Sequence, residues 1–350
     1  MNINQNAVLL LIMAAVLNGA PLLYGTLGEI LSEKAGNLNL GVEGMMFTGG
    51  AMGLGAAFYY EAAGGTVGVI AVLLALLFAF LGGAVGALIY SFLTVTLRAN
   101  QNVTGLTLTI FGSGVANFFG GALNNMAGGV GQISVAITSG AYRSSLPWAA
   151  NLGWFGQIFL NHGFMVYLAL VLAVLMHFFF TRSRMGLNLR AVGENPATAD
   201  AAGINVTRYK YLATCVGAGI SGLGGLYYTM DYIKGTWASE GTIEALGWLA
   251  VALVIFAVWR SLNAIWGSYL FGFLTWLYFY VPQIRALLIS AFHLSDDALQ
   301  FMVLTRSTQE LFKMLPYLVT ILVLIVVSLR KKRENQPPAS LGLAYFREER

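Results

Sequence analysis

The sequence predicts an all-α fold, a bundle of helices that crosses a membrane many times. Of its 350 residues 57% are hydrophobic and only 10% are charged, whereas roughly a quarter of the residues in a soluble domain carry charge. Apolar runs close to the ~20 residues that a helix needs to cross the hydrocarbon layer recur along the chain, with polar breaks between them. We therefore expect one polytopic membrane domain over residues 1–333 and a cytoplasmic tail over residues 334–350.

The net charge of +4 does not indicate a nucleic-acid partner. The positive residues gather in two loops beside predicted spans and lack the interleaved aromatic side chains of a nucleic-acid surface. Lys and Arg accumulate in the cytoplasmic loops of membrane proteins, which explains their placement here. We expect contact with the lipid bilayer and none with nucleic acid. The single cysteine, Cys215, excludes an internal disulfide.

The first half of the chain is expected to supply four spans, at residues 7–28, 45–60, 66–97 and 103–123. Residues 29–44 carry Glu29, Glu33 and Glu43 and are too polar to contact lipid. They form either a plain cytoplasmic loop or a broken segment that faces a cavity lined by protein. The spacing of the charges leaves both interpretations open.

The second half is expected to supply spans at residues 163–180, 211–230, 243–258, 264–281 and 308–329. Pro282 is expected to end the fourth of these. The positive residues 330–333 stop the last span and place the C-terminus in the cytoplasm. Alternating spans then give about nine crossings and an outside N-terminus, unless a re-entrant segment changes the count.

Three glycines, Gly217, Gly219 and Gly222, match the spacing of a dinucleotide-binding motif. That motif requires a preceding strand and a later acidic residue in a βαβ unit, and this stretch is an apolar run without either. Small residues let neighbouring membrane helices approach closely. We therefore expect these glycines to serve helix packing.

The polar stretch 186–210 is the largest charge-bearing island between apolar runs. From residue 182 to residue 210 five positive side chains stand against two negative ones: Arg182, Arg184, Arg190, Arg208 and Lys210 against Glu194 and Asp200. This excess predicts a cytoplasmic loop. Asn195 can cap a helix that begins at Pro196, where the missing amide hydrogen is tolerated. Because Gly203 suits the left-handed residue that ends a helix, a short helix of about two turns is predicted between Asn195 and Gly203.

The sequence contains no Walker A motif, no HExxH motif and no cluster of cysteines and histidines. We therefore expect no catalytic residue, metal or cofactor on this chain, and any ATP-driven cycle must use hydrolysis by a partner. A stand-alone secondary transporter or channel is the alternative, and it requires an ion-coupling charge deep in a span or an inverted repeat. A third alternative, an intramembrane enzyme, needs a catalytic dyad or a metal cluster.

Broken segments that line a cavity can offer amide side chains to a polar solute, since amides both donate and accept hydrogen bonds. The candidates for the solute path are Asn37, Asn39, Glu43, Asn100, Gln101 and Asn102. The alternative for each residue is that it satisfies backbone groups where a helix is interrupted.

Several motifs resemble those of one family of transporters. The stretch GLNLRAVGENPATADAAGINV (186–206) resembles the coupling loop of ATP-binding-cassette (ABC) importer permeases for nucleosides and simple sugars. Further similar segments are SEKAGNLNLGVEGMM (32–46), RANQNVTGL (98–106), MLPYLVTILVL (314–324) and PPASLGLAY (337–345). The resemblance covers nearly the whole chain and is to the shorter of the two permeases that pair in bacterial nucleoside importers.

This resemblance implies a set of partners. A cytoplasmic ATPase, which holds ATP and Mg²⁺, would dock on Arg190, Gly193, Glu194, Asn195, Pro196, Ala199, Asp200 and Gly203. A second, similar permease and an extracytoplasmic substrate-binding lipoprotein would complete the importer in the bacterial cytoplasmic membrane. The implied solute is a nucleoside, with a simple sugar or a vitamin as alternatives.

Overall fold

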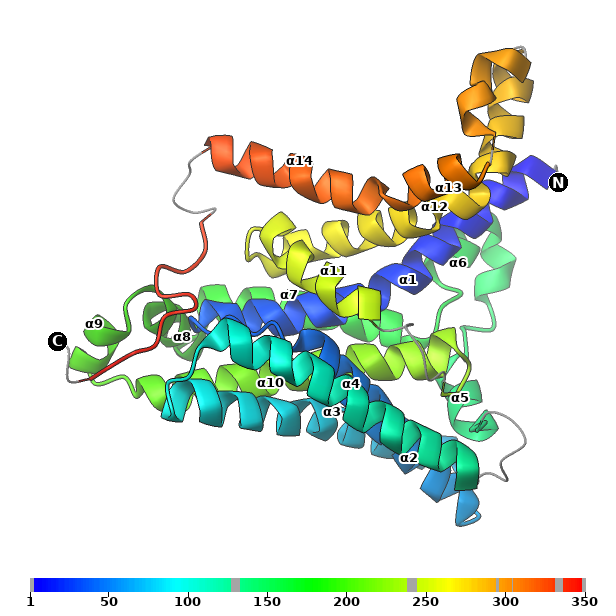
Figure 1. Ribbon diagram of the computed structural model, residues 1–350. Coiled ribbons are helices and arrows are strands. Elements are labelled where there is room, and N and C mark those ends of the chain that lie inside the picture. Colours follow the sequence, from blue (N-terminus) through cyan, green and yellow to red (C-terminus); the bar gives the residue numbers. More distant parts are fainter. Residues whose placement is uncertain are drawn as a thin grey trace.

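The computed structural model describes residues 3–126, 133–237, 244–293, 296–303, 305–330 and 336–347. Within these residues every regular element is a helix, which confirms the predicted all-α class (Figure 1). In chain order the helices are α1 (Ile3–Lys34), α2 (Val42–Ala62), α3 (Gly68–Ser91), α4 (Gln101–Met126), α5 (Ala136–Tyr142), α6 (Gly153–Phe159), α7 (Phe164–Arg182), α8 (Arg184–Glu194), α9 (Pro196–Ala201), α10 (Val206–Tyr227), α11 (Glu244–Phe256), α12 (Ser261–Phe292), α13 (Arg306–Lys313) and α14 (Leu315–Arg330). Single π-helical turns extend α3 over Phe92–Thr96 and α10 over Tyr228–Tyr232.

The centre of the bundle is α10, which packs against α1, α2 and α3, while α12 packs along α1. Glycines allow these helices to approach closely, because they carry no side chain at the contact. Gly217 faces Gly28 of α1, and Gly222 faces Gly49 of α2. Gly219 lies against an aromatic ring on α3. The predicted packing role of the three glycines in α10 is therefore confirmed.

Six helical stretches within the described residues are long and apolar enough to cross a membrane. They are Val8–Lys34, Gly68–Thr96, Gln101–Met126, Phe164–Arg182, Ser261–Phe292 and Arg306–Val326. Helices α2 and α10 have 21 and 22 residues but are largely enclosed by the others, and α11 has only 13. The count of about nine spans therefore stays a prediction. Apolar side chains such as Ile110 and Trp266 remain 75% and 79% exposed, as expected for a surface that lies in lipid.

Two predicted boundaries are wrong. The first span does not end at Gly28, since α1 continues to Lys34 and carries Glu29 and Glu33. Helix α12 continues through Pro282 for a further ten residues, to Phe292, because packed neighbours can compensate for the hydrogen bond that a proline removes. The last predicted span, residues 308–329, corresponds to α13 and α14, which together supply the stretch Arg306–Val326.

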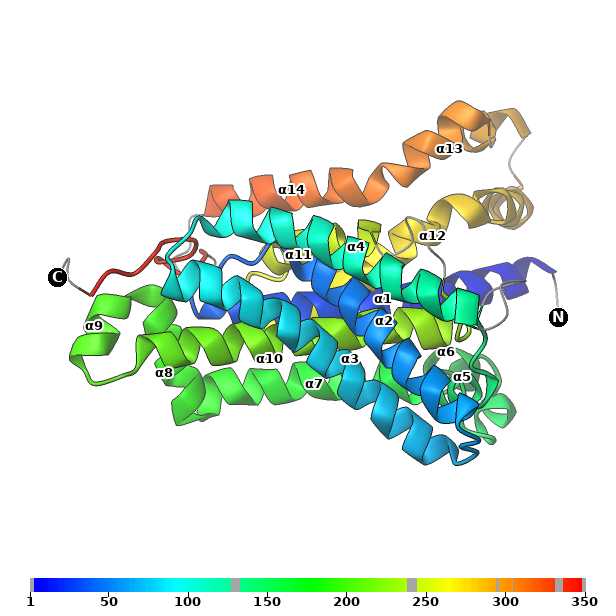
Figure 2. The same cartoon turned by 60° about the horizontal axis from the view of Figure 1, so that its bottom comes forward.

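The bundle has two distinct ends (Figures 1 and 2). Helices α8 and α9 lie at one end with residues 336–347, and the start of α1 lies at the other end with α5 and α6. We name the first the α8–α9 end. Which end faces the cytoplasm stays a prediction.

The closest approach in the core provides a test of the glycine packing. A methyl group added at Gly225 of α10 would overlap the carbonyl oxygen of Met46 on α2, whereas Gly114 on α4 has open space around it. We expect Gly225→Ala to lower the free energy of unfolding by about 1–3 kcal/mol or more, as overpacking does, and Gly114→Ala to have no such effect. Thermal unfolding of the purified variants in detergent measures the difference. Equal midpoints for the two variants would contradict the packing.

Candidate functional site

Residues 29–43 form a buried polar segment at the junction of α1 and α2. Glu29 and Glu33 lie one turn apart on α1 and are 1% and 2% exposed, and Asn37, Asn39 and Glu43 are also buried. The chain leaves α1 at Lys34 and enters α2 at Val42 without reaching solvent-exposed surface over most of this interval. Of the two interpretations of this stretch, the broken segment enclosed by protein is the one that the structure supports.

The two carboxylates of α1 anchor the segment. One carboxylate oxygen of Glu29 accepts a hydrogen bond from the backbone amide of Asn39 at 3.0 Å. The carboxylate of Glu33 accepts one from the indole nitrogen of Trp259, in the turn between α11 and α12. Buried charges need such partners, because burial removes their hydration. Glu43 begins α2 in contact with Gly247 of α11.

Side chains of three further helices hold the backbone of the break. The hydroxyl of Tyr90 on α3 donates to the carbonyl of Leu38 at 2.6 Å, and the amide of Leu38 donates to Gln101 on α4 at 2.7 Å. Asn37 donates to the hydroxyl of Thr214 on α10 at 2.8 Å. The hydroxyl of Thr109 on α4 donates to the carbonyl of Leu40 at 2.9 Å. These bonds give buried polar groups of the helix interruption partners within the protein.

The structure separates the six predicted solute-path residues into a buried group, Asn37, Asn39, Glu43 and Gln101, and an exposed pair, Asn100 and Asn102. Asn37, Asn39 and Gln101 come together in the buried network, where Asn39 and Gln101 satisfy backbone amides. The side-chain oxygen of Asn37 has no hydrogen-bond partner within the described residues. Asn100 and Asn102 are exposed, and Asn100 caps the start of α4 by accepting from the Val103 amide at 3.1 Å. Contact between any of these side chains and a solute stays a prediction.

The predicted short helix at the α8–α9 end is confirmed. Helix α9 begins at Pro196, and the side chain of Asn195 accepts from the Thr198 amide at 3.0 Å, as an N-cap does. Gly203 follows with φ +84°. The preceding helix α8 was not predicted. Its N-cap residue is Ser183, whose hydroxyl accepts a hydrogen bond from the Gly186 amide at 2.9 Å, and a serine at this position is a signal that a sequence analysis can use.

Residues 186–210 form what we name the coupling surface, and its predicted docking residues have two orientations. Arg190, Glu194 and Asn195 are exposed, while Pro196 and Asp200 are half-buried. Two further members, Gly193 and Ala199, are buried on the inner side. A side chain at Gly193 would overlap the carbonyl of Lys34, so α8 lies directly against the end of α1. One side of this surface is therefore free for a partner and the other contacts the buried polar segment.

The tail, residues 336–347, contacts both the coupling surface and the buried polar segment. The amide and hydroxyl of Ser340 donate to the carbonyl of Gly193 at 3.0 and 2.5 Å. The amide of Gly342 donates to the carbonyl of Gly36 at 3.2 Å. Tyr345 donates to the carboxylate of Asp200 at 2.9 Å. Sequence patterns did not reveal these contacts, because an irregular tail has no periodicity that points to a partner.

Six helical stretches that are long and apolar enough to cross a membrane, all within the described residues, indicate an integral membrane protein with several passes. The family model described as the permease component of branched-chain amino acid transport systems matches residues 11–324. The chain belongs to that permease family, and the resemblance seen in its motifs is confirmed. The family consists of transport subunits, not of enzymes.

Three relatives show what the chain is similar to. It is 35% identical to a putative glucose ABC transporter permease protein of Haloferax volcanii, over 97% of this chain and 98% of the relative. It is 30% identical to the nucleoside ABC transporter permease protein NupC of Lactococcus lactis, over 77% and 82%. It is 29% identical to the guanosine ABC transporter permease protein NupQ of Bacillus subtilis, over 75% and 80%. No solved structure matches the chain.

The bond between Trp259 and Glu33 can be tested by removing its donor. Trp259→Phe leaves a buried carboxylate oxygen without its hydrogen bond, which costs about 1–3 kcal/mol of folding free energy. Trp266→Phe is the matched control, because Trp266 is 79% exposed. We expect the thermal unfolding midpoint of the purified chain to fall for Trp259→Phe only. Retention of the wild-type midpoint would show that this bond does not anchor the buried polar segment.

Proposed function

We propose that this chain is the permease of an ATP-driven importer that moves a nucleoside or a simple sugar into the cell, with ATP hydrolysis on a separate ATPase. Family membership and the names of the relatives, which divide between nucleosides and glucose, support the importer and the solute class. The observation that carries the mechanism is the two-sided coupling surface. Its exposed side, with Arg190, Glu194 and Asn195, is available to an ATPase.

The inner side of the coupling surface gives a route from the ATPase to the solute path. Helix α8 contacts the carbonyl of Lys34 through Gly193, and Ser340 and Gly342 of the tail bind Gly193 and Gly36. The buried polar segment then contacts α3, α4 and α10 through hydrogen bonds. Packed backbones and hydrogen-bond networks of this kind transmit displacement between sites. Movement of α8 and α9 would therefore shift the ends of several helices together.

The remaining partners follow from the same proposal. A substrate-binding lipoprotein would deliver solute at the end where α5 and α6 lie, and a second, similar permease would complete the pathway. The lack of a Walker A motif in this chain supports an ATPase that is a separate subunit and supplies the ATP and Mg²⁺. In this arrangement the α8–α9 end faces the cytoplasm.

A charge reversal tests the docking side. Glu194→Lys is expected to weaken ATPase binding by roughly tenfold or more, because disruption of one interfacial charge pair costs about 2 kcal/mol or more. Glu310→Lys is the matched control, since Glu310 is 62% exposed and lies on α13 outside the coupling surface. The measurements are co-purification with the ATPase and ATP-driven uptake into liposomes, with permease assembly unchanged in both variants. Normal uptake by Glu194→Lys, or uptake without any ATPase, would refute the proposal.

One observation favours a second candidate, a stand-alone secondary transporter. Glu29 and Glu33 lie inside a helix long enough to span the membrane, and Asp231 is buried in the turn that extends α10. Ionisable groups in such positions often mark proton or ion pathways. Uptake by the chain alone in liposomes, driven by a pH gradient, would establish this candidate, and its absence there would exclude it.

A further inference from the structure

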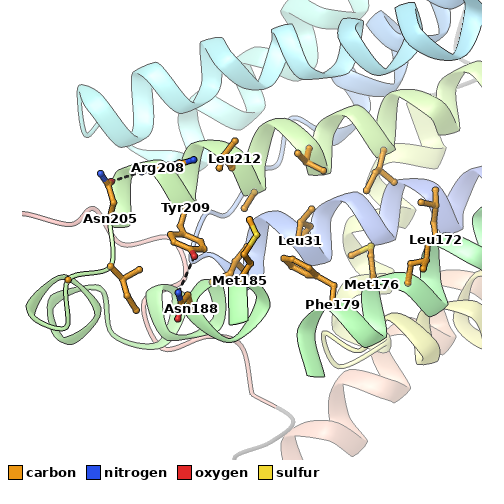
Figure 3. Close-up of a pocket in the computed structure, with 17 residues that line it drawn as sticks. Leu31, Leu172, Met176, Phe179, Met185, Asn188, Asn205, Arg208, Tyr209 and Leu212 are labelled. Carbon is orange, nitrogen blue, oxygen red and sulfur yellow. Dashed lines mark hydrogen bonds between the residues drawn. The ribbon is translucent and has the colours of Figure 1, made fainter. Parts of the chain in front are cut away.

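An apolar groove of about 770 Å³ runs along the outside of α7 and α10 at the α8–α9 end (Figure 3). Its walls include Leu172, Leu175, Met176 and Phe179 of α7, and Leu212, Val216 and Ile220 of α10. Figure 3 shows Leu31 of α1 between these two helices. Among the described residues that line the groove, Arg208 is the one with a charged side chain, and it lies near Asn205 at the end closest to α9.

The groove matches one leaflet of a bilayer in length. Arg208 and Ile220 are twelve residues apart on α10, which corresponds to about 18 Å along a helix. Half of the hydrocarbon core of a bilayer is about 15 Å thick. A hydrocarbon chain lying in the groove would thus reach from the charged end to about the middle of the membrane.

A basic hollow of about 750 Å³ adjoins the groove and shares four lining residues with it: Gly203, Ile204, Asn205 and Arg208. Four positive side chains line the hollow, Arg98, Arg208, Lys210 and Arg347, against the one carboxylate of Asp200. That carboxylate is 3.1 Å from the Arg347 guanidinium and also accepts from Tyr345. The difference, four minus one, leaves an excess of three positive charges.

Lys210 is the residue of the hollow that most requires an anion. It is 2% exposed, and its ammonium group has no hydrogen bond or ion pair to any other residue that the structure describes. Burial of an unpaired charge is costly. Arg98, which also lines the hollow, places its guanidinium over the Phe346 ring at 4.7 Å.

We propose that the groove and the hollow together bind one anionic phospholipid. The phosphate lies in the hollow near Arg208 and Lys210, and an acyl chain lies in the groove between α7 and α10. A basic pocket between membrane helices is the typical site for an anionic headgroup. An acidic protein segment would match the hollow but not the apolar groove that opens from it. The inference depends on the chain being a membrane protein and not on its solute. The hollow borders the coupling surface, because Asp200 and Gly203 line it, so the test below measures ATPase binding beside lipid binding.

The test counts bound lipid on the full-length chain. The protein is reconstituted in nanodiscs of phosphatidylcholine with phosphatidylglycerol, then extracted, and the phosphatidylglycerol that remains bound is measured by native mass spectrometry. Arg208→Gln removes a charge from an exposed side chain, and Val216→Trp fills the groove without changing charge. We expect each to reduce the retained phosphatidylglycerol at least tenfold. Arg184→Gln is the matched control, at the same end but outside both cavities, and should retain it.

The pair of variants separates the possible occupants. Loss of bound phosphatidylglycerol in both variants supports the proposal. Inorganic phosphate bound by a wild-type chain that retains no phosphatidylglycerol would overturn it in favour of a free-phosphate site. Unchanged lipid retention in both variants would also overturn it, and so would Arg208→Gln losing ATPase binding while lipid stays bound, which would assign the hollow to a protein interface.

Discussion

The helix break between α1 and α2 is the constraint on which the rest of the structure depends. Backbone groups buried in a protein have no water to bind, so an interrupted helix must find partners within the protein. Here the backbone partners come from α3 and α4 through Tyr90, Gln101 and Thr109, and Thr214 of α10 holds the side chain of Asn37. The position of each of these helices is thereby coupled to the same few residues, and the glycine contacts of α10 bring them close enough to make the bonds.

Local signals predicted the local features of the fold. Helix α9 was predictable because Asn195, Pro196 and Gly203 carry its start and its end within nine residues of sequence. The boundary of α1 was not, because Glu33 is stabilised inside the bundle by Trp259, which lies 226 positions later. The spacing of residues near Glu33 gives no information about a partner so far along the chain.

In the candidate site, too, local features were predicted from the sequence and long-range contacts were not. Spacing identified the amide-rich stretches but could not distinguish side chains that enter the bundle, such as Asn37 and Gln101, from exposed ones such as Asn100 and Asn102. The family resemblance predicted docking residues in the coupling surface, but it did not show that two of them, Gly193 and Ala199, are buried. The residues that connect the two parts were missed because their contacts are made by an irregular tail, for which sequence periodicity holds no signal.

The position of the tail in the chain has a consequence for biogenesis. Protein chains are made from the N-terminus and their early segments fold first, so Ser340 and Gly342 are synthesised after every helix of the bundle. Their bonds to Gly193 and Gly36 therefore form last. A chain that terminates before residue 340, or whose last helix fails to insert, would present α8 and α9 without the hydrogen bonds of Ser340 and Gly342. The inner side of the coupling surface is therefore complete only after these residues have been synthesised.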